Sequence, residues 1–131
     1  MSEQPAPRVL LTHFDWTLKR MEESLKNEPT EYYRDAALQR FGHTFDLAVK
    51  CLKTFAAEKG TECESAEQCF KFAAENHWLV PGADWQEMID AYKKVNQRLK
   101  GNPADETFAK LDRYYKFFES LYENLKRVEN H

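Results

Sequence analysis

The chain has 131 residues, of which 42% are hydrophobic and 14% aromatic, and its formal net charge is -3. That length predicts a single domain over residues 1–131 with a sizeable core. The slightly acidic balance argues against a dedicated nucleic-acid coat protein, which is normally basic overall.

Apolar residues in the first half recur at steps of three and four, which places them on one face of a helix. The first stripe consists of Leu11, Phe14, Leu18, Met21 and Leu25. Pro29 ends that helix. The second stripe consists of Leu38, Phe41, Phe45, Ala48, Leu52 and Phe55. Gly60 then predicts a C-terminal cap.

The second half contains a short helix and two longer ones. The spacing Ser65-x-x-Gln68 predicts a capping box that opens the short helix. Asp84 is expected to cap a fourth helix with the stripe Trp85, Met88, Tyr92, Val95 and Leu99. Asn102-Pro103 predicts an N-cap and a first helical residue. The last helix is expected to run through Ala104, Phe108, Leu111, Tyr115, Phe118, Tyr122 and Leu125.

Glycine and proline fall between these segments, and no alternating stretch indicates a strand. Four long amphipathic helices with short connections are typical of an antiparallel bundle. The sequence therefore predicts an all-α, up-and-down four-helix bundle with an additional short helix.

The cysteines and the termini indicate an intracellular protein without a metal. Cys51, Cys63 and Cys69 are odd in number and form no CxxC pair, so we interpret them as reduced, buried thiols. No metal site and no cofactor are predicted. The first residues lack the pattern of a signal peptide, and no stretch approaches about 18 uninterrupted apolar residues. We therefore expect a cytoplasmic protein that does not cross a membrane.

The histidines give little indication of catalysis. His43 lies between Phe41 and Phe45, without a second histidine at the spacing of a metal site, and a flank or interface position is the favoured interpretation. His77 ends the short helix, where its charge suits the helix dipole. Several apolar residues fall outside the main stripes and predict a homodimer contact. They are Leu47, Val49, Phe72, Tyr114, Phe117 and Leu121.

A basic stretch, AYKKVNQRLKG at residues 91–101, has two interpretations. One is a surface for a nucleotide, an RNA or a partner enzyme, because lysine and arginine suit phosphate. The other is the solvated side of the fourth helix, whose C-terminal end favours cations.

Residues 34–55, RDAALQRFGHTFDLAVKCLKTF, resemble the pattern RDxxIQRFEFTxELAWKxLK of the nucleotidyltransferase substrate-binding proteins, a family of the HEPN superfamily. The matching residues are Arg34, Asp35, Gln39, Arg40, Phe41, Thr44, Phe45, Leu47, Ala48, Lys50, Leu52 and Lys53. The likeness continues through DWQEMIDAY to the last helix. It implies a dimer of helical bundles whose partner is a separate, minimal nucleotidyltransferase, in some cases as a toxin–antitoxin pair.

Many relatives carry Arg-Asn-x-x-x-His, often followed by a tyrosine, near the end of the fourth helix, and active superfamily members cut RNA with that arginine and histidine. Here the arginine, asparagine and histidine positions fall on Tyr92, Lys93 and Gln97. Glutamine exchanges no proton near neutral pH, so the ribonuclease chemistry of the family is not expected.

The resemblance therefore predicts a non-catalytic subunit that binds substrate or nucleotide and pairs with a nucleotidyltransferase. The candidate binding residues are Arg40, Thr44, Lys50, Lys93 and Arg98. The alternative is a divergent ribonuclease that uses His43 together with Arg40 across a dimer.

Overall fold

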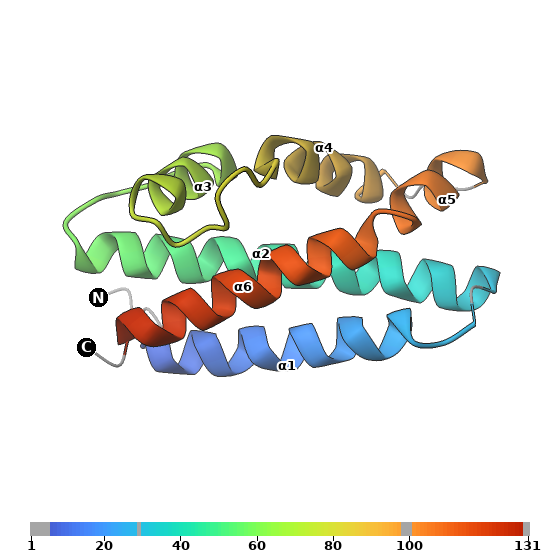
Figure 1. The fold of residues 1–131 in the computed structure, drawn as a ribbon, viewed down its shortest axis with the longest axis horizontal. Helices are drawn as coiled ribbons and strands as arrows, with labels where there is room; N and C mark the ends of the chain where they lie inside the picture. The colour runs from blue at the N-terminus through green and yellow to red at the C-terminus, as the bar shows by residue number, and fades with distance from the viewer. Residues whose placement is uncertain (1–5, 29, 98–100, 130–131) are drawn as a thin grey trace.

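A computed structural model describes residues 6–28, 30–97 and 101–129, and six helices lie within them (Figure 1). They are α1 (Pro7–Leu25), α2 (Glu31–Glu58), α3 (Ala66–Glu75), α4 (Trp85–Val95), α5 (Asn102–Phe108) and α6 (Leu111–Glu129). Leu99 and Arg98, which the sequence placed at the end of the fourth helix, lie outside the described residues.

Polar caps fix where the helices begin. The Ser65 hydroxyl accepts from the backbone N–H of Gln68 at 3.2 Å, and the Gln68 side chain accepts from the N–H of Glu64 at 2.8 Å. Asp84 accepts from the N–H of Glu87 at 2.9 Å. Both predicted starts are confirmed. The prediction for Asn102 is wrong by one position, because Gly101 is the N-cap and Asn102 is the first helical residue.

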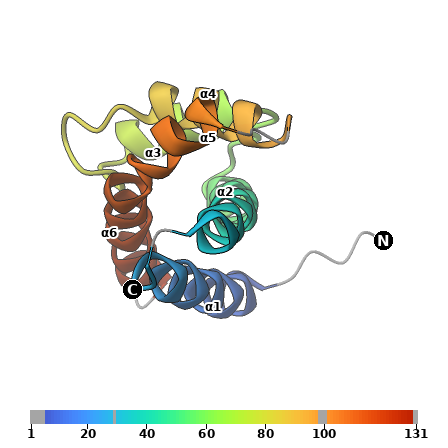
Figure 2. The ribbon, with the colours of Figure 1, turned by 90° about the vertical axis from the view of Figure 1, so that its right-hand side faces the viewer.

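The long helices α1, α2 and α6 lie side by side, and α3, α4 and α5 cover the remaining side of α2 and α6 (Figure 2). The fourth side of the bundle is thus built from short helices. The expected continuous last helix is divided, because residues 109 and 110 form a turn between α5 and α6. The predicted all-α bundle with an extra short helix is confirmed.

Aromatic rings fill the core between the long helices. The ring centres of Phe14 on α1 and Phe118 on α6 lie 6.2 Å apart. The ring centre of Phe41 on α2 lies 6.0 Å from that of Phe118. All three side chains have no exposed surface. The three cysteines are also buried and unpaired, as the sequence predicted. No helix of the described chain is long and apolar enough to span a bilayer.

The apolar residues expected to exceed the core are instead covered within one chain. Tyr114 and Leu121 are buried, and Leu47, Val49, Phe72 and Phe117 pack against the core as half-buried side chains. Tyr114 and Leu121 are thus core residues of one chain, whereas the other four keep some exposed surface. The homodimer remains a prediction, and Tyr114 and Leu121 offer no surface to it.

Candidate functional site

A groove of about 1060 Å³ opens along α2, between α1 and the end of α4. Phe41 and Phe45 on α2 point into the core. Most of the α2 residues that line the groove lie on the opposite side of that helix. The groove therefore runs along the solvent side of the helix that carries the family-like residues 34–55.

Aromatic and charged side chains line this groove. Trp16 on α1 is 61% exposed, and Tyr32 on α2 is 75% exposed. The guanidinium of Arg20 lies over the Trp16 ring, 5.0 Å from its centre. Arg40 Nη1 donates to the backbone carbonyl of Arg20 at 3.0 Å, which ties α2 to α1 at the groove wall. Exposed aromatic rings beside arginine are typical of binding surfaces.

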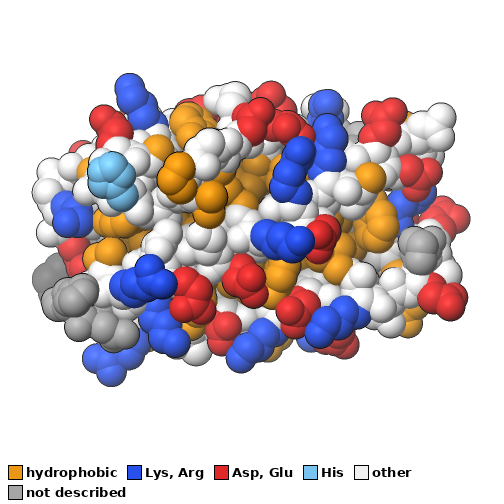
Figure 3. All heavy atoms as spheres, viewed as in Figure 1, with side chains coloured by type: hydrophobic (Ala, Val, Ile, Leu, Met, Phe, Trp, Pro, Cys, Tyr) orange, Lys and Arg blue, Asp and Glu red, His pale blue; other side chains and the backbone are white. Residues whose placement is uncertain are grey.

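The charges of the groove are balanced. Arg20 and Arg40 lie in the same lining as Asp35 and Asp46, and His43 lies among them. Asp35 is paired with Arg34 at 3.0 Å. The groove thus presents cationic and anionic groups side by side, together with exposed aromatic rings. The opposite face of the molecule, on which α6 lies, carries cationic and anionic side chains intermixed (Figure 3).

The structure places all three predicted binding residues of α2, of which one lines the groove. Arg40 lies in the groove. Thr44 is fully buried, and its hydroxyl donates to the carbonyl of Arg40 at 2.8 Å and lies 3.4 Å from that of Thr17. In this conformation Thr44 serves the contact between α1 and α2. Lys50 is exposed one turn beyond Asp46, on the same side of α2.

Of the three positions at which the resemblance led us to look for the arginine, asparagine and histidine, the first two contact other helices. The Tyr92 ring stacks on Phe45 at 3.9 Å, and its hydroxyl donates to Asp46. Lys93 Nζ lies 3.3 Å from Glu67 Oε1 and joins α4 to α3. Gln97 is exposed, and Arg98 lies outside the described residues. Of the described positions in the basic stretch, Asn96 reaches the groove together with Val95.

The first pair of the family-like segment has a structural role. The Arg34 side chain is only 12% exposed and donates through Nη1 to Asp105 at 3.0 Å. It also bonds Asp35, the next residue. Arg34 thereby fastens α5 to the start of α2.

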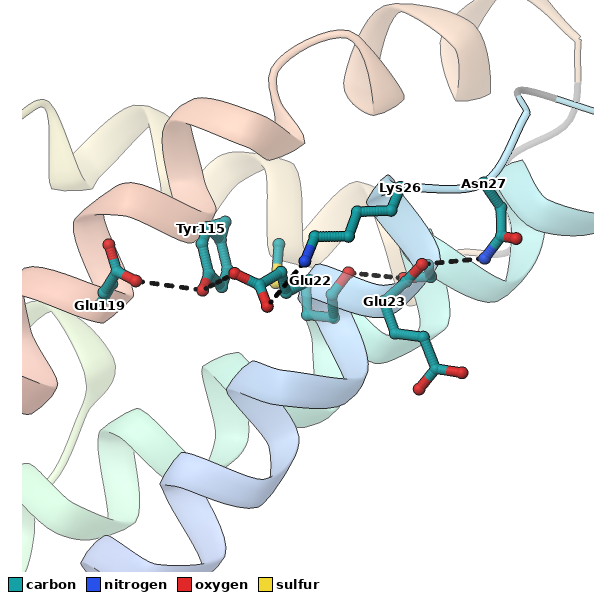
Figure 4. Close-up of polar contacts among 8 residues, drawn as sticks. Glu22, Glu23, Lys26, Asn27, Tyr115 and Glu119 are labelled. Atoms are coloured by element: carbon teal, nitrogen blue, oxygen red, sulfur yellow. Dashed lines mark hydrogen bonds and ion pairs between the residues drawn. The ribbon is translucent and has the colours of Figure 1, made fainter.

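Two polar clusters that the sequence did not indicate connect α6 to other helices. The Tyr115 hydroxyl lies 2.9 Å from Glu22 and 3.1 Å from Glu119, while Lys26 approaches Glu22 (Figure 4). Burial, followed by the two carboxylates, raises the pKa of Tyr115. Tyr115 therefore keeps its proton and acts as a clamp between α1 and α6.

The second cluster surrounds Glu87 on α4. Its carboxylate accepts from the Tyr114 hydroxyl at 3.0 Å and pairs with Lys110 at 3.3 Å and with Arg113. The Tyr114 hydrogen bond, with help from the two cations, holds the pKa of Glu87 below its ordinary value. This cluster fixes α4 on α6 and lies apart from the groove.

Among the groove residues that the sequence analysis did not propose, Trp16, Arg20 and Tyr32 supply exposed rings and a cation. Trp16 and Arg20 are one turn apart on α1, off the apolar stripe. A tryptophan at a polar position was the available signal. No group of three potential metal-ligating side chains occurs within residues 6–28, 30–97 and 101–129.

Comparison with known proteins gives one family. The family model described as "Nucleotidyltransferase substrate binding protein like" matches residues 10–127. The matched segment begins inside α1 and ends inside α6, so it contains every residue of the groove. No curated protein matches the chain.

Proposed function

The chain belongs to the nucleotidyltransferase substrate-binding-protein-like family, and from that premise we propose that it is a non-catalytic subunit that binds substrate for a separate, minimal nucleotidyltransferase. In this proposal the chain forms a homodimer within a hetero-oligomer and adopts the HEPN arrangement of its presumed relatives. The pair would act as a toxin–antitoxin-like system, with a nucleotide or an RNA segment as the bound substrate.

The observation that carries the proposal is the groove along α2. Its volume of about 1060 Å³ is ample for a nucleotide. Trp16 and Tyr32 offer faces on which a base can stack, and Arg20 and Arg40 offer donors to phosphate. Three of the family-like residues of α2, namely Asp35, Gln39 and Arg40, line it.

The absence of an acid–base pair at the expected place supports a non-catalytic role. Tyr92 is held by Phe45 and Asp46, and Lys93 by Glu67. Gln97 cannot transfer a proton near neutral pH. The side chains of Tyr92 and Lys93 thus connect α4 to α2 and α3.

The test is isolation of the tagged chain from its native host at moderate salt, with identification of the retained proteins by mass spectrometry. We expect a small nucleotidyltransferase in near-equal amount. The variant Trp16→Ala should retain less of the enzyme or its substrate, whereas the control Lys116→Ala, exposed on α6, should behave as the unchanged chain. Recovery of the chain without any nucleotidyltransferase would contradict the proposal.

A second candidate is a divergent ribonuclease, because His43 and Arg40 lie in the same groove. A histidine beside an arginine supplies proton transfer and phosphate stabilisation. This function predicts RNA cleavage by the purified chain that His43→Ala abolishes. RNA that stays intact after long incubation with micromolar protein would exclude it.

A further inference from the structure

Gly42 lies in the interior of α2, where a glycine weakens a helix relative to alanine. Its backbone is ordinary helix, unlike that of Gly60, Gly82 and Gly101, which have positive φ. Packing does not require it either. As far as the chain is described, a Cβ added at Gly42 would meet no atom within 4 Å beyond its two chain neighbours and its own helix backbone. Neither conformation nor packing within the described residues therefore explains this glycine.

The open space over Gly42 belongs to the groove, because Gly42 is one of its lining residues. Gln39 and Asp46 lie three residues before and four residues after Gly42 on the same side of α2, and both line the groove. At about 1.5 Å of rise per residue, their Cα atoms are about 10 Å apart along the helix. In Figure 2, where α2 is seen end-on, α6 lies on one side of it and no described helix covers the opposite side. Gly42 thus leaves a gap, wide enough for a planar ring, between two polar side chains.

We propose that a nucleobase with an exocyclic amino group lies flat over Gly42, and that Asp46 accepts a hydrogen bond from that amino group. This inference rests on the nucleotide site of the proposed function and names the class of base that the site takes. Glycine lets a ligand approach the backbone closely, which any larger side chain would prevent. The other face of the base is left to the exposed aromatic rings of the groove.

The backbone at Gly42 suits the face of a ring better than a phosphate. Backbone phosphate sites use N–H groups that have no partner, as at the start of a helix. Gly42 lies well inside α2, so its N–H is bonded within the helix and offers no donor. The phosphate of the same nucleotide is expected at Arg20 and Arg40, the cations of the groove.

Asp46 is held ready to contact the edge of the base. Its Oδ1 accepts from the Tyr92 hydroxyl, and the Tyr92 ring is stacked on Phe45 with 3.9 Å between the ring centres. Among the described residues, Oδ2 of Asp46 has no hydrogen-bond or ion-pair partner. An ionised carboxylate only accepts hydrogen bonds. It therefore favours adenine and cytosine, whose amino groups donate, over hypoxanthine and uracil, which carry a carbonyl oxygen at the same place.

The test is isothermal titration calorimetry of the purified full chain with AMP, IMP, CMP and UMP. AMP should bind at least about tenfold more tightly than IMP, and CMP than UMP, because only the amino-bearing bases donate to Asp46. Asp46→Asn keeps an oxygen for Tyr92 and offers the base an amide donor. It should therefore bring both ratios to within about threefold.

Gly42→Leu fills the gap and should lower the affinity for AMP at least about tenfold. The matched control Ala57→Leu, exposed on α2 outside the groove, should leave that affinity unchanged. Gly42→Ala separates binding from folding, because alanine is the better helix former and its Cβ meets open space. It should raise the midpoint of thermal unfolding by about 3–5 °C while it weakens AMP binding.

The outcomes separate this inference from the proposed function. Equal affinity for all four nucleotides, or unchanged affinity in Gly42→Leu, overturns the inference and leaves the nucleotide site standing. A preference for AMP and CMP that persists in Asp46→Asn overturns the contact to Asp46. A Gly42→Ala protein less stable than the unchanged chain shows that the fold itself needs this glycine, which also overturns the inference. A chain that binds none of the four at millimolar concentration overturns both the inference and the proposed nucleotide site.

Discussion

Two helices of the protein end in the same way but with different residues, and this difference makes a sharp stability prediction. At the end of α2, Gly60 has φ 80°, and the N–H of Thr61 bonds the carbonyl of Ala56 at 2.9 Å. At the end of α3, His77 has φ 61°, and the N–H of Trp78 bonds the carbonyl of Ala73 at 2.9 Å. Both ends follow the Schellman pattern, which favours glycine at the left-handed position.

The expected magnitude follows from the backbone. A left-handed conformation costs a residue with a side chain about 1–2 kcal/mol, and glycine loses about 0.5–1 kcal/mol through its greater freedom when unfolded. The His77 side chain is exposed, so His77→Gly gives up little packing. We therefore expect His77→Gly to raise the free energy of unfolding by about 0.5–1 kcal/mol. Gly60→Ala should lower it by about 1 kcal/mol.

The assay is thermal and urea unfolding followed by circular dichroism at constant protein concentration. The midpoint temperature should rise by about 2–5 °C for His77→Gly and fall by a similar amount for Gly60→Ala. His77→Ala removes the imidazole but keeps the strain, so it should stay close to the unchanged chain. A His77→Gly protein less stable than the His77→Ala protein would refute the reasoning.

Three further predictions concern thiols, pH and the core. Burial raises the pKa of the Cys51 thiol to about 12 and also raises that of Cys69, so Ellman's reagent at pH 8 should label these thiols far more slowly in the native protein than in urea. Equal labelling rates would contradict this burial. Because the folded state holds the pKa of Glu87 below its ordinary value, it binds fewer protons than the unfolded chain, and stability should fall from about pH 6 to about pH 3. Glu87→Gln should weaken that dependence, measured by urea unfolding across the range; an unchanged slope would argue against the cluster around Glu87. Phe118→Ala should cost about 3–5 kcal/mol in the free energy of unfolding, since Phe118 has no exposed surface and its ring meets Phe14 and Phe41; a loss below about 1 kcal/mol would contradict that packing.

The bundle could be predicted because its helices are amphipathic and their caps are local. Ser65 and Asp84 each bond a backbone N–H three residues ahead, so the sequence contains both partners. The turn at residues 109 and 110 could not be predicted, because apolar spacing continues across it through Phe108 and Leu111. Whether Tyr114 and Leu121 are covered depends on where the short helices pack, which spacing does not reveal.

The candidate site was predictable only in part. The likeness of residues 34–55 to a known family is confirmed by the match over residues 10–127, and it led to Arg40. Contacts between distant residues escaped sequence reasoning, such as the bond from Tyr92 to Asp46 across 46 positions. Thr44 was predicted to lie on the surface as a binding residue, but it is buried. A polar residue off the apolar stripe can still be covered by a neighbouring helix.

The central claim is that this chain is a substrate-binding subunit for a nucleotidyltransferase. The most direct measurement is transfer of a labelled nucleotide by the enzyme isolated with the chain, assayed alone and with an equimolar amount of the chain added back. The account predicts faster transfer with the unchanged chain and a weaker effect with Trp16→Ala, which removes an exposed ring of the groove. Transfer at the same rate with and without the chain would contradict the account.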